Sequence, residues 1–151
     1  MVISNTTFIQ DSTLFIRDLF LSGGVTDPIS GTRPSGETFV MTSYPSKPVT
    51  YPIISVKNDN ITSMPAGMRS EESNRSLSFE VRVWARTEPE KDSLTQQVIN
   101  RLFSMQTDTT SGAIDFGLTG LKISSAVNVD EPGIGGIHSK VIAVSYDYYT
   151  S

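Results

Sequence analysis

The chain has 151 residues, of which 37% are hydrophobic and 19% charged, and its net charge is −4. This length and composition predict a single globular domain over residues 1–151. The chain has no cysteine and only one histidine, which excludes disulfides and cysteine catalysis and disfavours zinc sites and histidine-based triads. Its acidic balance disfavours tight binding to nucleic acid, because DNA-binding domains carry a basic excess.

The first predicted element is an amphipathic helix over about residues 8–22. Thr7 and Gln10 have the spacing of a capping box, in which each side chain bonds the backbone amide of the other residue. Phe15 and Leu19 follow at helical spacing, and the glycines that come after Ser22 end the helix because glycine accepts a left-handed conformation.

Three strands are predicted in the middle of the chain. Short runs over 39–43 and 51–57 come first, and Pro52 favours a sheet edge or a strand beginning for the second run. Residues 77–86 then alternate between apolar and polar side chains, which is the period of a half-buried strand.

A second helix and a hairpin complete the predicted fold. The helix begins at the capping box Thr87-Glu88-Pro89-Glu90 and carries Leu94, Val98 and Leu102 as its apolar stripe. Strands over 121–129 and 137–149 are close enough in sequence to form an antiparallel hairpin. We therefore predict an α+β fold: a mostly antiparallel sheet of four or five strands, two helices on one face, and long loops. The residues expected in the core are Phe15, Leu19, Phe79, Val81, Val83, Leu94, Val98, Leu102, Ile123 and Val127.

Three features could suggest a chemical site, and each has a simpler structural interpretation. The glycines of Gly133-Ile134-Gly135-Gly136 lack the lysine and the helix of a phosphate loop, so they indicate a hairpin turn. Asp59, Glu71 and Glu72 match no cation-binding loop and are expected to be solvated. His138 has no carboxylate near it in sequence, which favours a structural or surface histidine. We therefore expect no catalytic residue, no cofactor and no metal.

Five segments in a fixed order carry a resemblance to a known family. They are the N-terminal helix, the strands TYPIISVK and LSFEVRVWAR, the helix TEPEKDSLTQQVINRLF and the final strand SKVIAVSYDYY. This order resembles the tail-terminator or tail-completion proteins of tailed viruses, the group typified by the lambda tail terminator. The resemblance implies a structural protein of the virion, made in the host cytoplasm, that forms a ring, commonly of six copies.

The implied ring caps the tail tube and joins it to the head-side connector. Its partners would be further copies of the chain, the tail tube protein and a connector or neck protein, with no membrane. DNA would pass through the lumen without tight binding, because an acidic lumen repels phosphates. Two alternatives stay open: another neck protein, such as a head-completion adaptor or a minor tail-tube subunit, and a cytoplasmic binding module or hydrolase.

The predicted sheet has a face that the helices leave open, and strand 77–86 would place Arg82, Trp84 and Arg86 on it. An exposed tryptophan between two arginines favours an interface, where both residue types are enriched. We expect these three residues to contact a neighbouring subunit, together with Tyr146 and Tyr148 if the last strand shares the face. The alternative is that Trp84 covers a local edge or packs under a loop.

The two long loops, over 23–38 and 58–75, are predicted docking arms. Because they are long, polar and without a core of their own, we expect them to be mobile in a free subunit and ordered in an assembled one. Candidate docking residues in and near them are Tyr44, Lys47, Met68 and Arg69.

Overall fold

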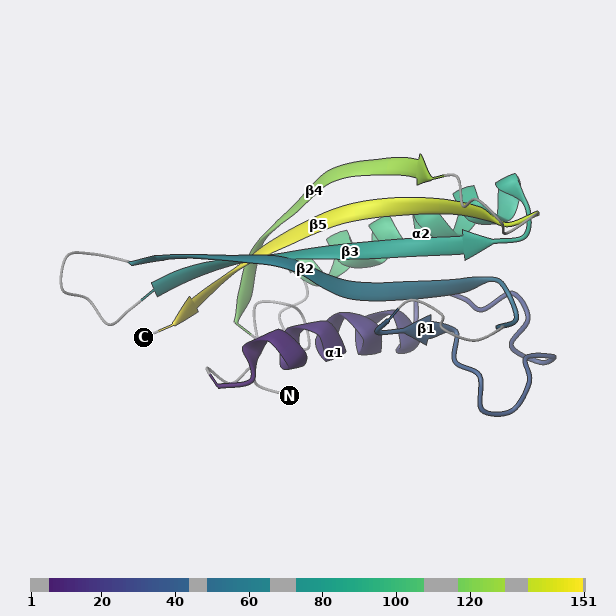
Figure 1. Ribbon diagram of the computed structural model, residues 1–151, viewed down its shortest axis with the longest axis horizontal. Coiled ribbons are helices and arrows are strands. Elements are labelled where there is room, and N and C mark those ends of the chain that lie inside the picture. The colour runs from purple at the N-terminus through teal and green to yellow at the C-terminus, as the bar shows by residue number, and fades with distance from the viewer. Residues whose placement is uncertain (1–5, 44–48, 66–72, 108–116, 130–135, 151) are drawn as a thin grey trace.

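The computed structural model describes residues 6–43, 49–65, 73–107, 117–129 and 136–150 (Figure 1). The elements in chain order are α1 (Phe8–Leu21), β1 (Val40–Met41), β2 (Ile53–Pro65), β3 (Ser73–Ala85), α2 (Glu88–Thr107), β4 (Leu118–Val129) and β5 (His138–Thr150). This succession of helices and strands confirms the predicted α+β class.

The five strands form one sheet in the order β1-β2-β3-β5-β4. The pairs β2–β3, β3–β5 and β5–β4 are antiparallel, whereas the short β1 runs parallel to β2. The predicted hairpin of the last two strands is therefore confirmed. β5 lies between β3 and β4, so the last strand in the chain is an interior strand of the sheet (Figure 1).

Both helices pack on the same face of the sheet. Alternate residues of β3, from Leu77 to Val83, point toward the helices and are fully buried. Phe15 of α1 and Leu102 of α2 lie in the same apolar cluster. Of the predicted core, the residues found buried are Phe15, Leu19, Phe79, Val81, Val83, Leu94, Val98 and Leu102.

Two predicted core residues on β4 differ from expectation. Ile123 is only partly buried against the core, and Val127 is 55% exposed. The exposure of Val127 results from a register shift between Ile123 and Ser125, because a bulge adds one residue and reverses which face the following side chains occupy. Ile123 therefore pairs with the buried Val144, whereas Val127 lies on the face without helices.

The second predicted loop is largely a β-hairpin, so the expected loop over 58–75 is wrong. β2 continues to Pro65 and β3 begins at Ser73, and together they extend past the start of α1 (Figure 1). The polar run that suggested a loop is accommodated by a bulge, in which Asp59 has no partner on β3. The side-chain amide of Asn58 donates to the backbone carbonyl of Ser78 across this bulge, at 3.4 Å.

The start of α1 also differs from prediction, although the bounds of the helix match. The hydroxyl of Thr7 donates to the carboxylate of Asp11 at 2.8 Å, and its side chain makes no capping bond to the backbone. A capping side chain must accept from the backbone of the first turn, which requires an extended conformation, whereas the backbone of Thr7 has φ −127° and ψ 21°. The predicted capping box with Gln10 does not form.

The first predicted loop, residues 23–38, is packed against the domain. Val25 is buried, and the backbone amide of Thr26 donates to the side-chain carbonyl of Gln97 on α2 at 2.9 Å. Arg33 and Asp27 form an ion pair of 2.6 Å, with side chains only 6% and 13% exposed. The expectation that this loop lacks packing of its own is therefore wrong.

Replacing Asp27 with asparagine should lower the free energy of unfolding by about 1–3 kcal/mol, because it leaves the buried guanidinium of Arg33 without its charged partner. The hydrogen bond from Arg33 holds the pKa of Asp27 below its ordinary value of 3.8. The stabilisation is therefore full near neutral pH and is lost as the pH falls from about 4 through the lowered pKa. Urea denaturation at a series of pH values measures this difference.

The matched control for that experiment is Asp18→Asn. Asp18 pairs with Arg17 at 2.7 Å, but both side chains are substantially exposed. An exposed ion pair contributes less than about 1 kcal/mol, so Asp18→Asn should change stability little at any pH. Equal effects of the two substitutions would contradict the structural role assigned to the Arg33–Asp27 pair.

Candidate functional site

The candidate assembly surface is the face of the sheet that the helices leave open, which we call the open face. By the strand register, Arg82 of β3 lies beside Ser55 of β2 and Val141 of β5, and Val127 of β4 lies beside Val141. Arg82 forms an ion pair of 3.1 Å with Glu80, two residues before it on the same strand. The middle of the open face is therefore a mixture of small, aliphatic and paired charged side chains.

Trp84 lies on the open face but is only 4% exposed, so the expected exposed tryptophan is wrong. Its indole N–H donates to the hydroxyl of Ser55 at 3.2 Å. The ring of Tyr51 lies 6.4 Å from it, centroid to centroid, and the guanidinium of Arg82 lies 5.0 Å from its centroid. Trp84 is thus covered from within the chain, as the alternative of local packing predicts.

The position of Tyr51 depends on the first loop. The guanidinium of Arg33 donates to the carbonyls of Thr50 and Pro52, at 2.8 and 2.6 Å, on either side of Tyr51. The loop of residues 23–38 therefore holds the segment that packs against Trp84. The sequence predicts an edge position or the beginning of a strand at Pro52, and it contains no signal that Arg33 and Trp84 contact this segment.

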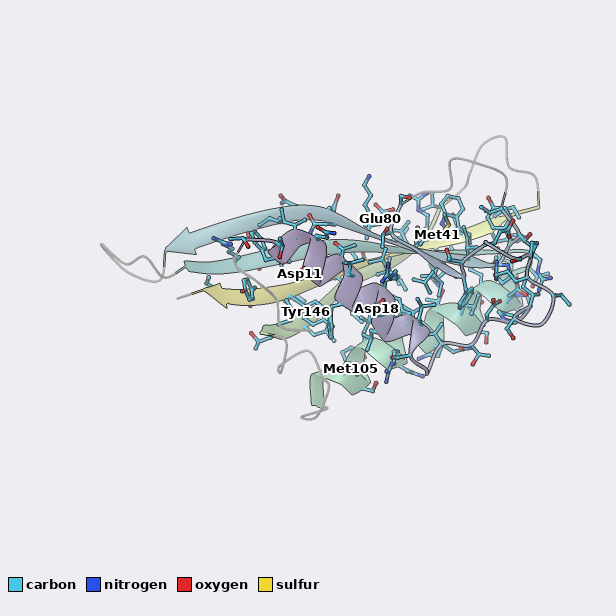
Figure 2. All side chains as sticks on the ribbon, turned by 90° about the horizontal axis from the view of Figure 1, so that it is seen from below. Asp11, Asp18, Met41, Glu80, Met105 and Tyr146 are labelled. Atoms are coloured by element: carbon cyan, nitrogen blue, oxygen red, sulfur yellow. The ribbon has the colours of Figure 1, made fainter. Side chains whose placement is uncertain are left out.

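Tyr146 and Tyr148 lie on the face that the helices cover, opposite to Trp84. Tyr146, which Figure 2 labels, pairs with Leu77 in the sheet and is completely buried. The ring of Tyr148 stacks on that of Phe8 at the start of α1, 6.1 Å between centroids. Burial raises the pKa of Tyr146, which keeps its hydroxyl neutral in the folded protein. The two tyrosines were predicted to join the interface only if the last strand placed them on the open face, and it does not.

Arg86 follows the end of β3 and donates to Glu90 in the first turn of α2. Its guanidinium pairs with the carboxylate of Glu90 at 2.5 Å, and its backbone amide donates to the same carboxylate at 3.1 Å. The hydroxyl of Thr87 accepts from the amide of Glu90 at 3.3 Å, so half of the predicted capping box forms. The hydrogen bond from Arg86 lowers the pKa of Glu90 and keeps the pair charged.

The five residues predicted for the subunit interface therefore do not form one surface. Arg82 is on the open face, Arg86 is at the start of α2, and Trp84 is buried between them. Whether Arg82 and Arg86 contact a neighbouring subunit stays a prediction. The candidate docking residues Tyr44, Lys47, Met68 and Arg69 lie outside the described residues.

A polar cluster joins the start of α2 to β5. Glu88 accepts from Lys91 at 2.5 Å and lies 2.8 Å from the imidazole of His138. The hydrogen bond from Lys91, more than the nearby His138, lowers the pKa of Glu88. His138 thus has a carboxylate neighbour that is distant in sequence. Across the described ranges, no three histidine, cysteine or acidic side chains group as metal ligands would.

A shallow pocket of about 320 Å³ lies between α1 and β1. Arg17 is its one charged lining residue, and the guanidinium of Arg17 is bound to the adjacent Asp18. Figure 2 shows α1, with Asp18 labelled, and Met41 of β1, which also lines the pocket. The side chains that line it are those of Arg17, Leu21, Thr38, Val40, Met41, Thr42 and Ser43.

Comparisons with known proteins assign no family. A scan against protein-family models gives no match, and a search of the curated proteins gives no significant relative. Within the part of the chain that the structure describes, no helix has the length and apolar character to cross a membrane.

Proposed function

We propose that this protein is a structural subunit of a virion, and that its copies form a ring that ends the tail tube of a tailed virus. The ring joins the tube to the connector or neck protein on the head side. Its partners are further copies of the chain, commonly six in a ring, the tail tube protein and that connector.

The observation that supports this proposal is the order and arrangement of the elements. The resemblance to tail terminators rests on a helix, a pair of strands, a second helix and a terminal hairpin. The strands belong to one sheet, and both helices pack on one face of it. Among the described residues, no helix or strand lies over the part of the open face around Val127 or beyond the edge of β4, so both are available for contacts with other chains.

The charge of the chain fits the passage of DNA through such a ring. Each copy has a net charge of −4, so a closed ring would be strongly acidic. Like charges repel across a narrow lumen, which would keep DNA phosphates from binding to its wall. The proposal therefore assigns DNA the role of a passing molecule and not of a tightly held ligand.

The experiment that tests this function combines solution mass with tube binding. Light scattering over a concentration series should show a discrete large oligomer, and negative-stain images of it should show rings. Added to purified tail tubes of the same virus, the protein should bind at one end of each tube. A protein that stays monomeric at every concentration and leaves both tube ends bare would contradict the proposal.

A further inference from the structure

Within the described residues, the outer edge of β4 has none of the usual protection of an edge strand along its second half. β4 is the last strand of the sheet on this side, and no described element lies beyond it (Figure 1). Residues 124–128 are all exposed. Natural proteins usually protect such edges with charges, prolines, bulges or short strands. The single charge of β4, Lys122, and both of its bulges lie before Ser125.

The second half of β4 is also regular and uncharged. From Ser125 to Val129 each residue pairs in register with β5. Val127 is 55% exposed on the open face, whereas Ala126 pairs with the buried Ile142 on the helix side. A regular, uncharged edge of this kind is a template for another strand.

The opposite edge of the sheet is protected in the ways that β4 is not. β1 has only two residues, and the part of β2 beyond it carries a bulge at Asp59. Lys57 and Asp59 are exposed charges on this part of β2. Head-to-tail pairing of β4 with this edge would therefore meet charges and an irregular backbone.

We propose that the second half of β4 pairs antiparallel with the same segment of a second copy, about a two-fold axis at Val127. The two Val127 side chains then lie side by side on the open face, and Ser125 faces Val129 of the second copy. On the helix side, Ala126 faces Asn128 of the second copy. No like charges meet, because the two Lys122 side chains lie at opposite ends of the paired segment.

The contact is self-complementary, which is the requirement of a two-fold interface. It joins the two five-stranded sheets into one continuous sheet. The inferred pairing of β4 does not rest on the proposed function, because a two-fold contact cannot by itself close a ring about one axis. The inference concerns pairs of subunits, whether or not those subunits also build a ring.

The absence of cysteine from the chain makes a single-cysteine test possible. Val127→Cys places two thiols directly opposite each other, at a backbone separation that a disulfide can span. Under mild oxidation we expect a disulfide-linked dimer at a rate at least about tenfold above that of Phe103→Cys, because a formed interface raises the effective thiol concentration. Phe103 is 54% exposed on α2 and serves as the matched control. Cross-linking at the rate of the control would overturn the proposal.

A second measurement uses charge in place of a cross-link. In the wild-type protein, the backbone amides of residues 124–129 that point away from β5 should exchange their hydrogens slowly with solvent, because backbone carbonyls of the second copy accept hydrogen bonds from them. Val127→Lys should make these amides exchange at the rate of free strand edges, and Phe103→Lys should not. Fast exchange in the wild type would overturn the pairing. A ring that persists in Val127→Lys would leave the proposed function intact, and a cross-linked dimer without rings would contradict only that function.

Discussion

Replacing Leu102 with alanine should lower the free energy of unfolding by about 2–5 kcal/mol. Leu102 is fully buried near the end of α2, in the apolar cluster that α1, α2 and the sheet share. The substitution removes the transfer free energy of the side chain and leaves a cavity that the rigid sheet cannot close. Chemical denaturation followed by circular dichroism measures the change.

The next residue in the same helix gives the control. Phe103 is 54% exposed, so Phe103→Ala should change the free energy of unfolding by less than about 0.5 kcal/mol. The packing of α2 on the sheet predicts this contrast between neighbours. Similar losses for the two substitutions, or no loss for Leu102→Ala, would contradict the packing.

Trp84→Ala should destabilise the protein by about 3–5 kcal/mol, although Trp84 lies on the face without helices. The indole is enclosed by Tyr51, Arg82 and Ser55, and it donates a hydrogen bond to Ser55. Trp84 is the only tryptophan of the chain, so its fluorescence reports its own environment. The wild-type emission should be that of a buried indole and should shift to longer wavelength on unfolding.

Trp84→Phe separates packing from hydrogen bonding. The phenyl ring keeps most of the contact with Tyr51 but cannot donate to Ser55, so the loss should be about 1 kcal/mol. Denaturation followed by circular dichroism measures both variants. A Trp84→Ala protein as stable as the wild type would show that the indole is not enclosed.

The helices and the central strand could be predicted because apolar residues recur in each of them at a regular spacing. Apolar and polar side chains alternate in β3 from Leu77 to Val83, and α2 carries its apolar stripe at a spacing of four residues. In such elements the hydrophobic pattern alone decides which side chains face the core. The predictions for Phe79, Val98 and Leu102 are confirmed for this reason.

The bulges explain the largest errors in the predicted strands. One extra residue reverses the faces of all that follow, and the composition of a strand does not show where that residue falls. The bulge after Ile123 moved Val127 from the predicted core to the open face. The bulge at Asp59 allowed β2 to continue through a polar run that resembles a loop.

The candidate site was harder to predict than the fold, because it depends on contacts between distant segments. The alternation of β3 correctly placed Trp84 away from the helices. It could not show that Arg33 would fix the backbone around Tyr51, or that Tyr51 would cover the indole. Propensity and period are local properties, whereas the burial of an open face is decided by tertiary structure.

The interior position of β5 sets an order for the growth of the sheet during synthesis. β4 pairs with β5 and not with β3, so it has no strand to join until residues 138–150 have left the ribosome. Until then the nascent chain can pair β2 with β3 and pack both helices against that hairpin, while β4 remains unpaired. The uncharged edge of β4 is therefore formed only after β5 has paired with β3.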